Sequence, residues 1–279
     1  MCYNEFIIVG VFMNWFENFL YHMQAKMNTP EPFGWFHVLW ILLTFTTLYV
    51  LYKIKNKHND KQLKWVLAIY GIIAFLLELI KQLIWSFNYD PTTNLITWNY
   101  EWYAAPFQLC TTPMYISLIC LFLKKNKLRD ALLSYVAFFT ILGGLTTILM
   151  PSSCFTSYIE INIHTMYLHC GSLVLSIYLL LSKEIKLTFS NFFYGYVVFL
   201  VLAFIANTLN ICFYQFGFIG DETFNMFYIS PYFISELPIY NVIQQNVPYI
   251  VYLLFYILTI FIGSLIVYNI TCFIKRVID

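Results

Sequence analysis

Charged residues are scarce in this chain of 279 residues. Asp, Glu, Lys and Arg together make up 10% of it, whereas a soluble domain contains about 25%. This scarcity excludes a disordered chain, a nucleic-acid-binding protein and an ordinary soluble enzyme. Hydrophobic residues make up 61% of the sequence and aromatic residues 21%. The composition therefore predicts an all-α, polytopic membrane helical bundle.

The sequence also lacks a recognisable soluble domain, an internal repeat and a low-complexity tract. The absence of a repeat disfavours the secondary-transporter folds that are built from repeated halves. About seven segments reach the roughly 20 apolar residues that a helix needs to cross a bilayer core of about 30 Å. They lie at about 34–53, 65–87, 105–123, 130–149, 162–182, 189–212 and 248–273.

Lys and Arg are missing from every second loop. The loops 88–104, 150–161 and 213–247 contain neither residue, whereas the other loops and the C-terminal tail contain thirteen of the fifteen. Basic loops stay on the cytoplasmic side of a membrane protein. The alternation therefore predicts seven spans, with the N-terminus outside and the C-terminus inside.

The first 33 residues form a separate extracytoplasmic segment in this interpretation, and residues 34–279 form a single transmembrane helical domain. Apolar residues recur at spacings of three and four from Phe6 to Leu20, which predicts an amphipathic helix lying on the outer surface. A signal peptide is disfavoured because the basic start and small-residue cleavage site are missing. An eighth span is the remaining alternative.

Polar side chains gather in the predicted outer halves of five spans, whereas the inner halves are almost purely apolar. Ionisable groups inside a membrane are costly and usually functional. The topology therefore predicts one polar cavity that opens toward the outer leaflet. The residues concerned are His37, Glu78, Lys81, Gln108, Cys110, His164, His169, Asn207 and Asn210.

Each of these residues also has a purely structural interpretation. Glu78 and Lys81 are three residues apart and suit an ion pair on one helix face. Asn207 and Asn210 suit hydrogen bonds between helices, and His37 and His164 suit the membrane interface. Cys110 alone suits a small apolar filler. His169 is harder to explain structurally, because it is predicted to lie deeper in the membrane.

The third predicted span has an unusual start. Pro113 cannot donate a hydrogen bond to the carbonyl of Leu109, so we expect a kink or loosening there. Thr111 and Thr112 are placed to satisfy the freed groups. Irregular backbone at membrane depth is tolerated where it lines a cavity.

Several short motifs resemble the YwaF family of bacterial integral membrane proteins over about residues 33–272. The motifs are Phe-Gly-Trp-Phe-His ending at His37, Glu78, Pro-Phe-Gln-Leu-Cys ending at Cys110, Gly143-Gly144, Pro151, His164 with His169, Asn-Met-Phe-Tyr at 225–228, and Pro231. The chain differs where Cys170 follows His169, since the family usually has His-Gly, and the segment between Asn207 and Asn225 is longer.

The YwaF family is similar to the transmembrane protein 164 acyltransferases, which transfer a fatty acyl chain onto a lysophospholipid. By position, the resemblance implies Cys110 and His169 as the catalytic residues. We therefore predict a lipid acyltransferase or lipid-ester hydrolase in a bacterial plasma membrane. Its expected partners are membrane phospholipids or lysophospholipids, and no cofactor is indicated.

The predicted reaction uses Cys110 as nucleophile and His169 as general base. Glu78 or His164 is expected to orient His169, and Gln108 or Asn207 to stabilise the oxyanion. The alternatives are a multi-pass transporter and a lipid-binding subunit without catalysis. A metal site formed by Glu78, His164 and His169 is a further alternative, although no spacing indicates one.

Overall fold

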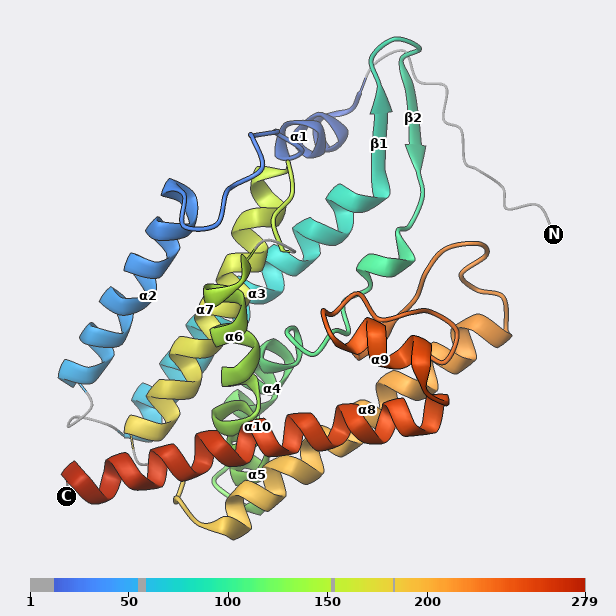
Figure 1. Cartoon of the computed structure of the whole chain (residues 1–279). Helices are drawn as coiled ribbons and strands as arrows, with labels where there is room; N and C mark the ends of the chain where they lie inside the picture. Colours follow the sequence, from blue (N-terminus) through green and yellow to red (C-terminus); the bar gives the residue numbers. More distant parts are fainter. Residues whose placement is uncertain (1–12, 55–58, 152–153, 183, 279) are drawn as a thin grey trace.

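The computed structural model describes residues 13–54, 59–151, 154–182 and 184–278 (Figure 1). The fold is all-α apart from one hairpin. Its helices are α1 (Trp15–Met23), α2 (Trp35–Ile54), α3 (Asp60–Ser86), α4 (Thr112–Phe122), α5 (Lys127–Phe138), α6 (Thr140–Leu149), α7 (Ile159–Leu181), α8 (Phe189–Gln215), α9 (Tyr240–Asn246) and α10 (Tyr249–Ile278), with short 3-10 turns η2 (Trp102–Ala104) and η4 (Met226–Tyr228).

Six helical segments in the described part of the chain are long and apolar enough to cross a membrane. Five are single helices, and the sixth joins α5 and α6 into one stretch over Lys127–Leu149. The third predicted span, 105–123, is wrong in length, because only Thr112–Phe122 is helical. Eleven residues extend roughly 16 Å, about half of a bilayer core.

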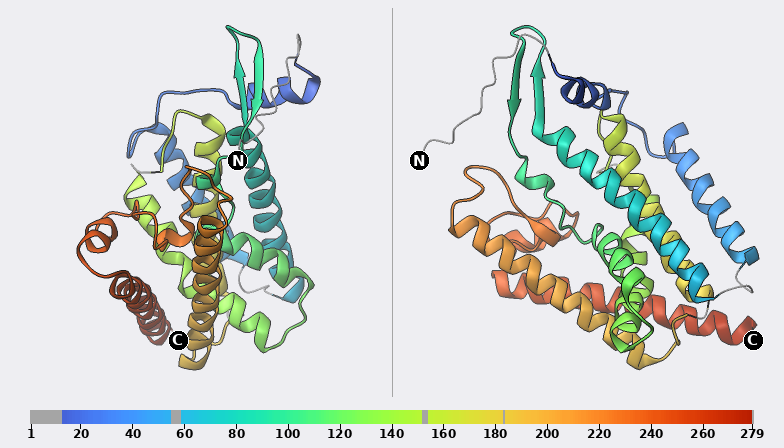
Figure 2. Two further views of the ribbon diagram at one scale, coloured as in Figure 1. Left: turned by 90° about the vertical axis from the view of Figure 1, so that its right-hand side faces the viewer. Right: turned by 180° about the vertical axis from the view of Figure 1, so that it is seen from behind.

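The long helices form two groups. Figures 1 and 2 show α2, α3 and α7 running together, while α8 and α10 cross them at a steep angle. Helix α5 contacts α7 as well as α8 and α10, so it joins the two groups. Aromatic side chains of α5, α8 and α10 fill the main core, among them Phe138, Phe192 and Tyr256.

Most of the basic residues, although not Lys26 and Lys81, belong to one end of the bundle. The end of α2, the start of α3, the end of α7 and the end of α10 lie at the lower side of Figure 1, opposite the hairpin and α1. Lys53 ends α2, and Lys275 lies in the last turn of α10. Which end faces the cytoplasm stays a prediction. Arg129 differs from an ordinary loop cation, because it is buried and forms ion pairs with Asp60 and Glu184.

At the opposite end of the bundle, side-chain hydrogen bonds between residues close in sequence stabilise α1. Asn14 and Glu17 each accept a hydrogen bond from the other's backbone N–H at 2.9 Å, which caps the start of α1. The predicted helix over residues 6–20 is thus described only in its last part, as the start of α1; residues 6–12 lie outside the described residues. The antiparallel strands β1 (Phe87–Asp90) and β2 (Leu95–Trp98) lie in the predicted 88–104 loop, except for Phe87, which ends the predicted second span.

Candidate functional site

A buried carboxylate forms the centre of the polar side chains in the bundle. Glu78 of α3 is 3% exposed. Its Oε1 lies 2.7 Å from Lys81 Nζ, one turn along the same helix, and its Oε2 lies 2.7 Å from His164 Nε2 of α7. The predicted Glu78–Lys81 ion pair is therefore confirmed, and the same carboxylate also joins two helices.

Two residues that the sequence analysis did not select complete this network. Gln82 Nε2 donates 2.7 Å hydrogen bonds to Glu78 Oε1 and to the Ala104 carbonyl. Tyr100 Oη donates to Gln82 Oε1, also at 2.7 Å. Gln82 lies four residues after Glu78, a spacing that places both on one helix face. The network thereby connects α3 to the segment that leads to Cys110.

Among the described residues, one nitrogen of the His164 ring has a hydrogen-bond partner and the other has none. Nε2 faces the Glu78 carboxylate, which only accepts hydrogen bonds, so we assign the ring proton to Nε2. The other nitrogen, Nδ1, is buried and has no hydrogen-bond partner among the described residues. Buried polar atoms are seldom left unpaired. An imidazole held in this way by a carboxylate has its second nitrogen available to accept a proton.

Cys110 lies in the irregular segment 105–111, between η2 and α4. Thr112 Oγ1 donates to the Leu109 carbonyl at 2.7 Å, and Thr111 Oγ1 donates to the Gln108 carbonyl at 2.8 Å. The predicted role of both threonines is confirmed. The expected kink takes another form, because Pro113 lies in the first turn of α4 and the residues before it are not helical.

Cys110 is half-buried and close enough to the Glu78 network for the charges of Lys81 and Glu78 to act on its thiol. No hydrogen bond joins Cys110 to His169 in the part of the chain that the structure describes. The nucleophile and base implied by the resemblance are thus not in direct contact.

His169 lies at a close contact between α6 and α7. Its Nδ1 is 2.9 Å from Thr147 Oγ1, so Thr147, rather than Glu78 or His164, contacts this ring. Gly144 permits the close approach, because a Cβ atom there would lie 2.6 Å from the His169 carbonyl oxygen. The His169 ring is half-buried, and its other nitrogen, Nε2, takes no part in the hydrogen bond with Thr147.

Gln108 and Asn210 hold a strained turn. Gln108 accepts from the Phe227 N–H at 2.9 Å and donates to the Asn225 carbonyl at 3.1 Å. Asn210 binds both the N–H and the carbonyl of Met226, at 2.7 and 3.0 Å. Phe227 adopts a φ of 58°, which is unfavourable for a bulky residue. These amide groups therefore fix the backbone of η4 beside segment 105–111.

The remaining predicted residues lie apart from the Glu78 network. Asn207 Oδ1 accepts from Tyr249 Oη at 2.7 Å, which supports its predicted interhelical role. His37 is buried, and its Nδ1 accepts from the Phe33 N–H at 3.0 Å. Among the described residues, no group of three or more His, Cys, Asp or Glu side chains is placed to hold a metal ion.

The loop that precedes Cys110 also carries ionisable groups outside the spans. Glu222 Oε2 accepts from the Trp102 N–H at 2.8 Å. Burial, and then the charge of Glu222, raise the pKa of Glu101 above its ordinary value. Burial raises the pKa of Tyr103 to about 12, so this side chain is a neutral phenol at pH 7. The environment of Glu101 in this loop therefore disfavours additional negative charge.

Comparison with known proteins identifies one family. A model of the TMEM164 family matches residues 7–268, which is nearly the whole chain. No curated protein and no solved structure matches. The match agrees with the predicted relationship to the transmembrane protein 164 proteins, whereas the narrower YwaF assignment stays a prediction.

Proposed function

This multi-pass membrane protein belongs to the TMEM164 family, and from that premise we propose that it is a thiol-dependent lipid acyltransferase. Cys110 is the nucleophile, and His169 is the general base. Membrane phospholipids supply the acyl group, and a lysophospholipid accepts it. If water is the acceptor, the same residues make the protein a lipid-ester hydrolase.

One observation supports this proposal above the others. The half-buried thiol of Cys110 lies in an irregular segment, close enough to the buried Glu78 carboxylate and the Lys81 ammonium for both charges to act on it, and the same carboxylate contacts the imidazole of His164. A thiol needs a neighbouring base to become a nucleophile near neutral pH. An ester bond lies between the headgroup and the tails of a phospholipid, so a site in the outer half of a span suits it.

The first step forms an acyl-enzyme. The Cys110 proton moves to His169 Nε2, and the sulfur attacks the ester carbonyl to form a C–S bond. The C–O bond of the ester then breaks, and the leaving lysophospholipid oxygen takes the proton back from the imidazole. The product is a thioester on Cys110 and a free lysophospholipid.

The second step reverses this order with a new acceptor. The acceptor hydroxyl gives its proton to His169 and attacks the thioester carbonyl. The C–S bond breaks, and the Cys110 sulfur recovers the proton. Thr147 holds the His169 ring through Nδ1 in both steps. Glu78, Lys81 and Gln82 hold the backbone that leads to Cys110, and Gln108 retains one N–H to donate to the oxyanion.

The acyl-enzyme provides the test. Purified protein is incubated with a phosphatidylcholine or phosphatidylethanolamine that carries a fluorescent acyl chain, and its intact mass is measured before and after hydroxylamine treatment. We expect a hydroxylamine-sensitive adduct that Cys110→Ala removes. Cys110→Ser should lose lipid turnover. Cys212→Ala is the matched control, because Cys212 is also a half-buried, free cysteine.

A second experiment identifies the base. We expect His169→Ala to slow adduct formation by roughly 10²- to 10⁴-fold, the usual contribution of a general base. His164→Ala should have a smaller effect, through loss of the Glu78 contact. If His164→Ala causes the larger loss, the unpaired Nδ1 of His164 is the base and the assignment to His169 is wrong.

Other results favour the alternative functions. Ligand uptake by proteoliposomes that depends on Glu78, without an acyl adduct in folded protein, indicates a transporter. A lipid that copurifies in native mass spectrometry and is never cleaved indicates a lipid-binding subunit. Full activity in both Cys110 variants would exclude covalent catalysis at this residue.

A further inference from the structure

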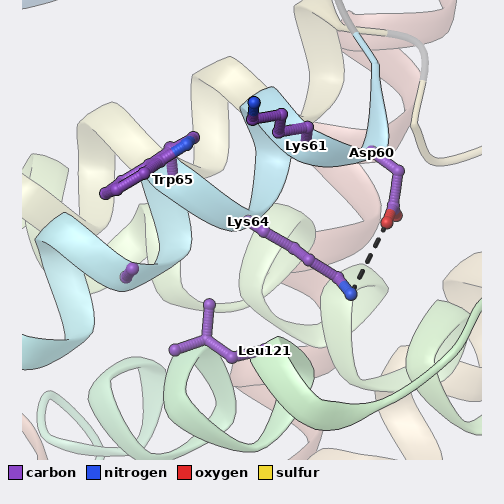
Figure 3. Close-up of a pocket in the computed structure, with 6 residues that line it drawn as sticks. Asp60, Lys61, Lys64, Trp65 and Leu121 are labelled. Atoms are coloured by element: carbon purple, nitrogen blue, oxygen red, sulfur yellow. Dashed lines mark ion pairs between the residues drawn. The ribbon is translucent and has the colours of Figure 1, made fainter.

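A groove lies at the basic end of the bundle, far from the Glu78 network. It is formed by the first turns of α3 and the last turn of α4, and its volume is about 440 Å³. Figure 3 shows Lys61, Lys64 and Trp65 on α3, with Lys64 extending toward Asp60 and with Leu121 on the neighbouring α4. Lys64 and Glu78 are fourteen residues apart on α3, or roughly 21 Å. The groove is therefore separate from the proposed active site.

The groove carries an excess of positive charge. Asp60 lies 2.7 Å from the buried Arg129, and Glu184 is paired with Arg129 and with Lys125. Lys64 Nζ is 3.7 Å from Asp60, a longer contact. Within the described residues Lys61 forms no ion pair. The lining itself contains two lysines and one carboxylate, and that carboxylate is also paired with Arg129, so the groove carries a net positive charge.

The rest of the groove and its surroundings are apolar. Trp65, Ala68 and Leu121 line it. Trp65 is 62% exposed, and Phe122 beside Leu121 is 86% exposed. Exposed Trp next to Lys is typical of the level where lipid headgroups meet acyl chains. Leu121, in the last turn of α4, supplies the apolar side chain of the groove on the α4 side.

We propose that this groove binds an anionic phospholipid. The phosphate lies between Lys61 and Lys64, and one acyl chain follows Trp65, Ala68 and Leu121. Two features select this occupant over a zwitterionic lipid or a soluble anion. The uncompensated charge attracts a net negative headgroup, and the apolar wall gives a long chain a surface that free phosphate cannot use.

Native mass spectrometry in mild detergent tests the proposal. Full-length protein is titrated with phosphatidylglycerol, with phosphatidylcholine of the same chains, and with inorganic phosphate. We expect phosphatidylglycerol to bind more tightly than phosphatidylcholine. The double variant Lys61→Gln with Lys64→Gln should weaken it about thirtyfold, since a lysine near an anionic lipid contributes about fivefold.

Two further variants keep the test decisive. Lys275→Gln with Arg276→Gln removes the same charge from the tail and should leave binding unchanged. Ala68→Phe fills the apolar wall while retaining both lysines, and it should also weaken phosphatidylglycerol binding. Equal binding of both lipids, or equal losses in the two charge variants, would overturn the proposal. Competition by inorganic phosphate as effective as that by the lipid would show an anion site and also overturn it.

Discussion

Glu78→Ala is the most informative substitution for the stability of the site. The carboxylate accepts hydrogen bonds or ion pairs from Lys81, Gln82 and His164, each at 2.7 Å. Its removal leaves the Lys81 ammonium, whose side chain is 12% exposed, without a counterion inside the bundle. Removing one partner of a buried ion pair costs about 3–5 kcal/mol.

This free energy predicts a measurable change in thermal unfolding. A change of 1 kcal/mol shifts the Tm of a large domain by about 2–4 °C, so Glu78→Ala should lower the Tm by on the order of 10 °C. Glu78→Gln should cost less, because the amide oxygen still accepts a hydrogen bond. Glu236→Ala is the control, since Glu236 is an exposed carboxylate in a loop, and it should have little effect.

A double-mutant cycle isolates the ion pair. Lys81→Met in the Glu78→Ala background removes the unpaired charge and should restore part of the lost stability, with a coupling energy of about 1–3 kcal/mol. The four proteins are heated in the same detergent at the same rate. A loss below about 1 kcal/mol for Glu78→Ala, with simple additivity in the double variant, would refute the buried-network interpretation.

Three further predictions test the surroundings of the site. Gly144→Ala should destabilise the fold by about 1–3 kcal/mol in thermal unfolding, because the added Cβ would lie 2.6 Å from the His169 carbonyl oxygen. Gly143→Ala is the control, because a Cβ added at Gly143 would meet no atom within 4 Å. Thr147→Val keeps the side-chain shape but removes the His169 contact, and it should slow acyl-adduct formation roughly tenfold. Glu101→Gln should stabilise the protein at pH 7 but not well below pH 4.5, the ordinary pKa of this carboxyl.

The sign of the Glu101 effect follows from proton linkage. A carboxyl whose pKa is raised by folding binds more protons in the native state, so wild-type stability falls as pH rises from the ordinary pKa through the folded pKa. Glu101→Gln removes this loss. Equal Tm differences between Glu101→Gln and wild type at both pH values would contradict this linkage argument. A Gly144→Ala protein as stable as Gly143→Ala would contradict the close contact at Gly144. Unchanged adduct formation in Thr147→Val would contradict the role of Thr147 in holding His169.

The membrane spans were predictable, because a long apolar stretch next to a basic loop can be recognised from local composition alone. The six candidate spans lie within or around the predicted segments, including Phe189–Gln215 for 189–212. Segment 105–111 was only partly predictable. Pro113 and the two threonines signalled irregular backbone, but the local sequence does not distinguish a kinked helix from one that begins at Thr112.

Contacts between distant elements were not predictable from one sequence. Glu78 and His164 are 86 residues apart, and their pairing depends on how α3 packs against α7. The contact between Thr147 and His169 depends likewise on the approach that Gly144 permits. Arg129 was predicted as a loop cation, because nothing local indicates that Asp60 and Glu184 would bury it.

The mass of the acyl-enzyme tests the central claim most directly. Wild-type protein and the Cys212→Ala control should each gain one acyl mass after incubation with the fluorescent phospholipid, and hydroxylamine should remove it. Cys110→Ala should gain none. The same adduct in Cys110→Ala, or no adduct in folded wild-type protein across several lipids, would contradict the assignment of a Cys110 acyl-enzyme.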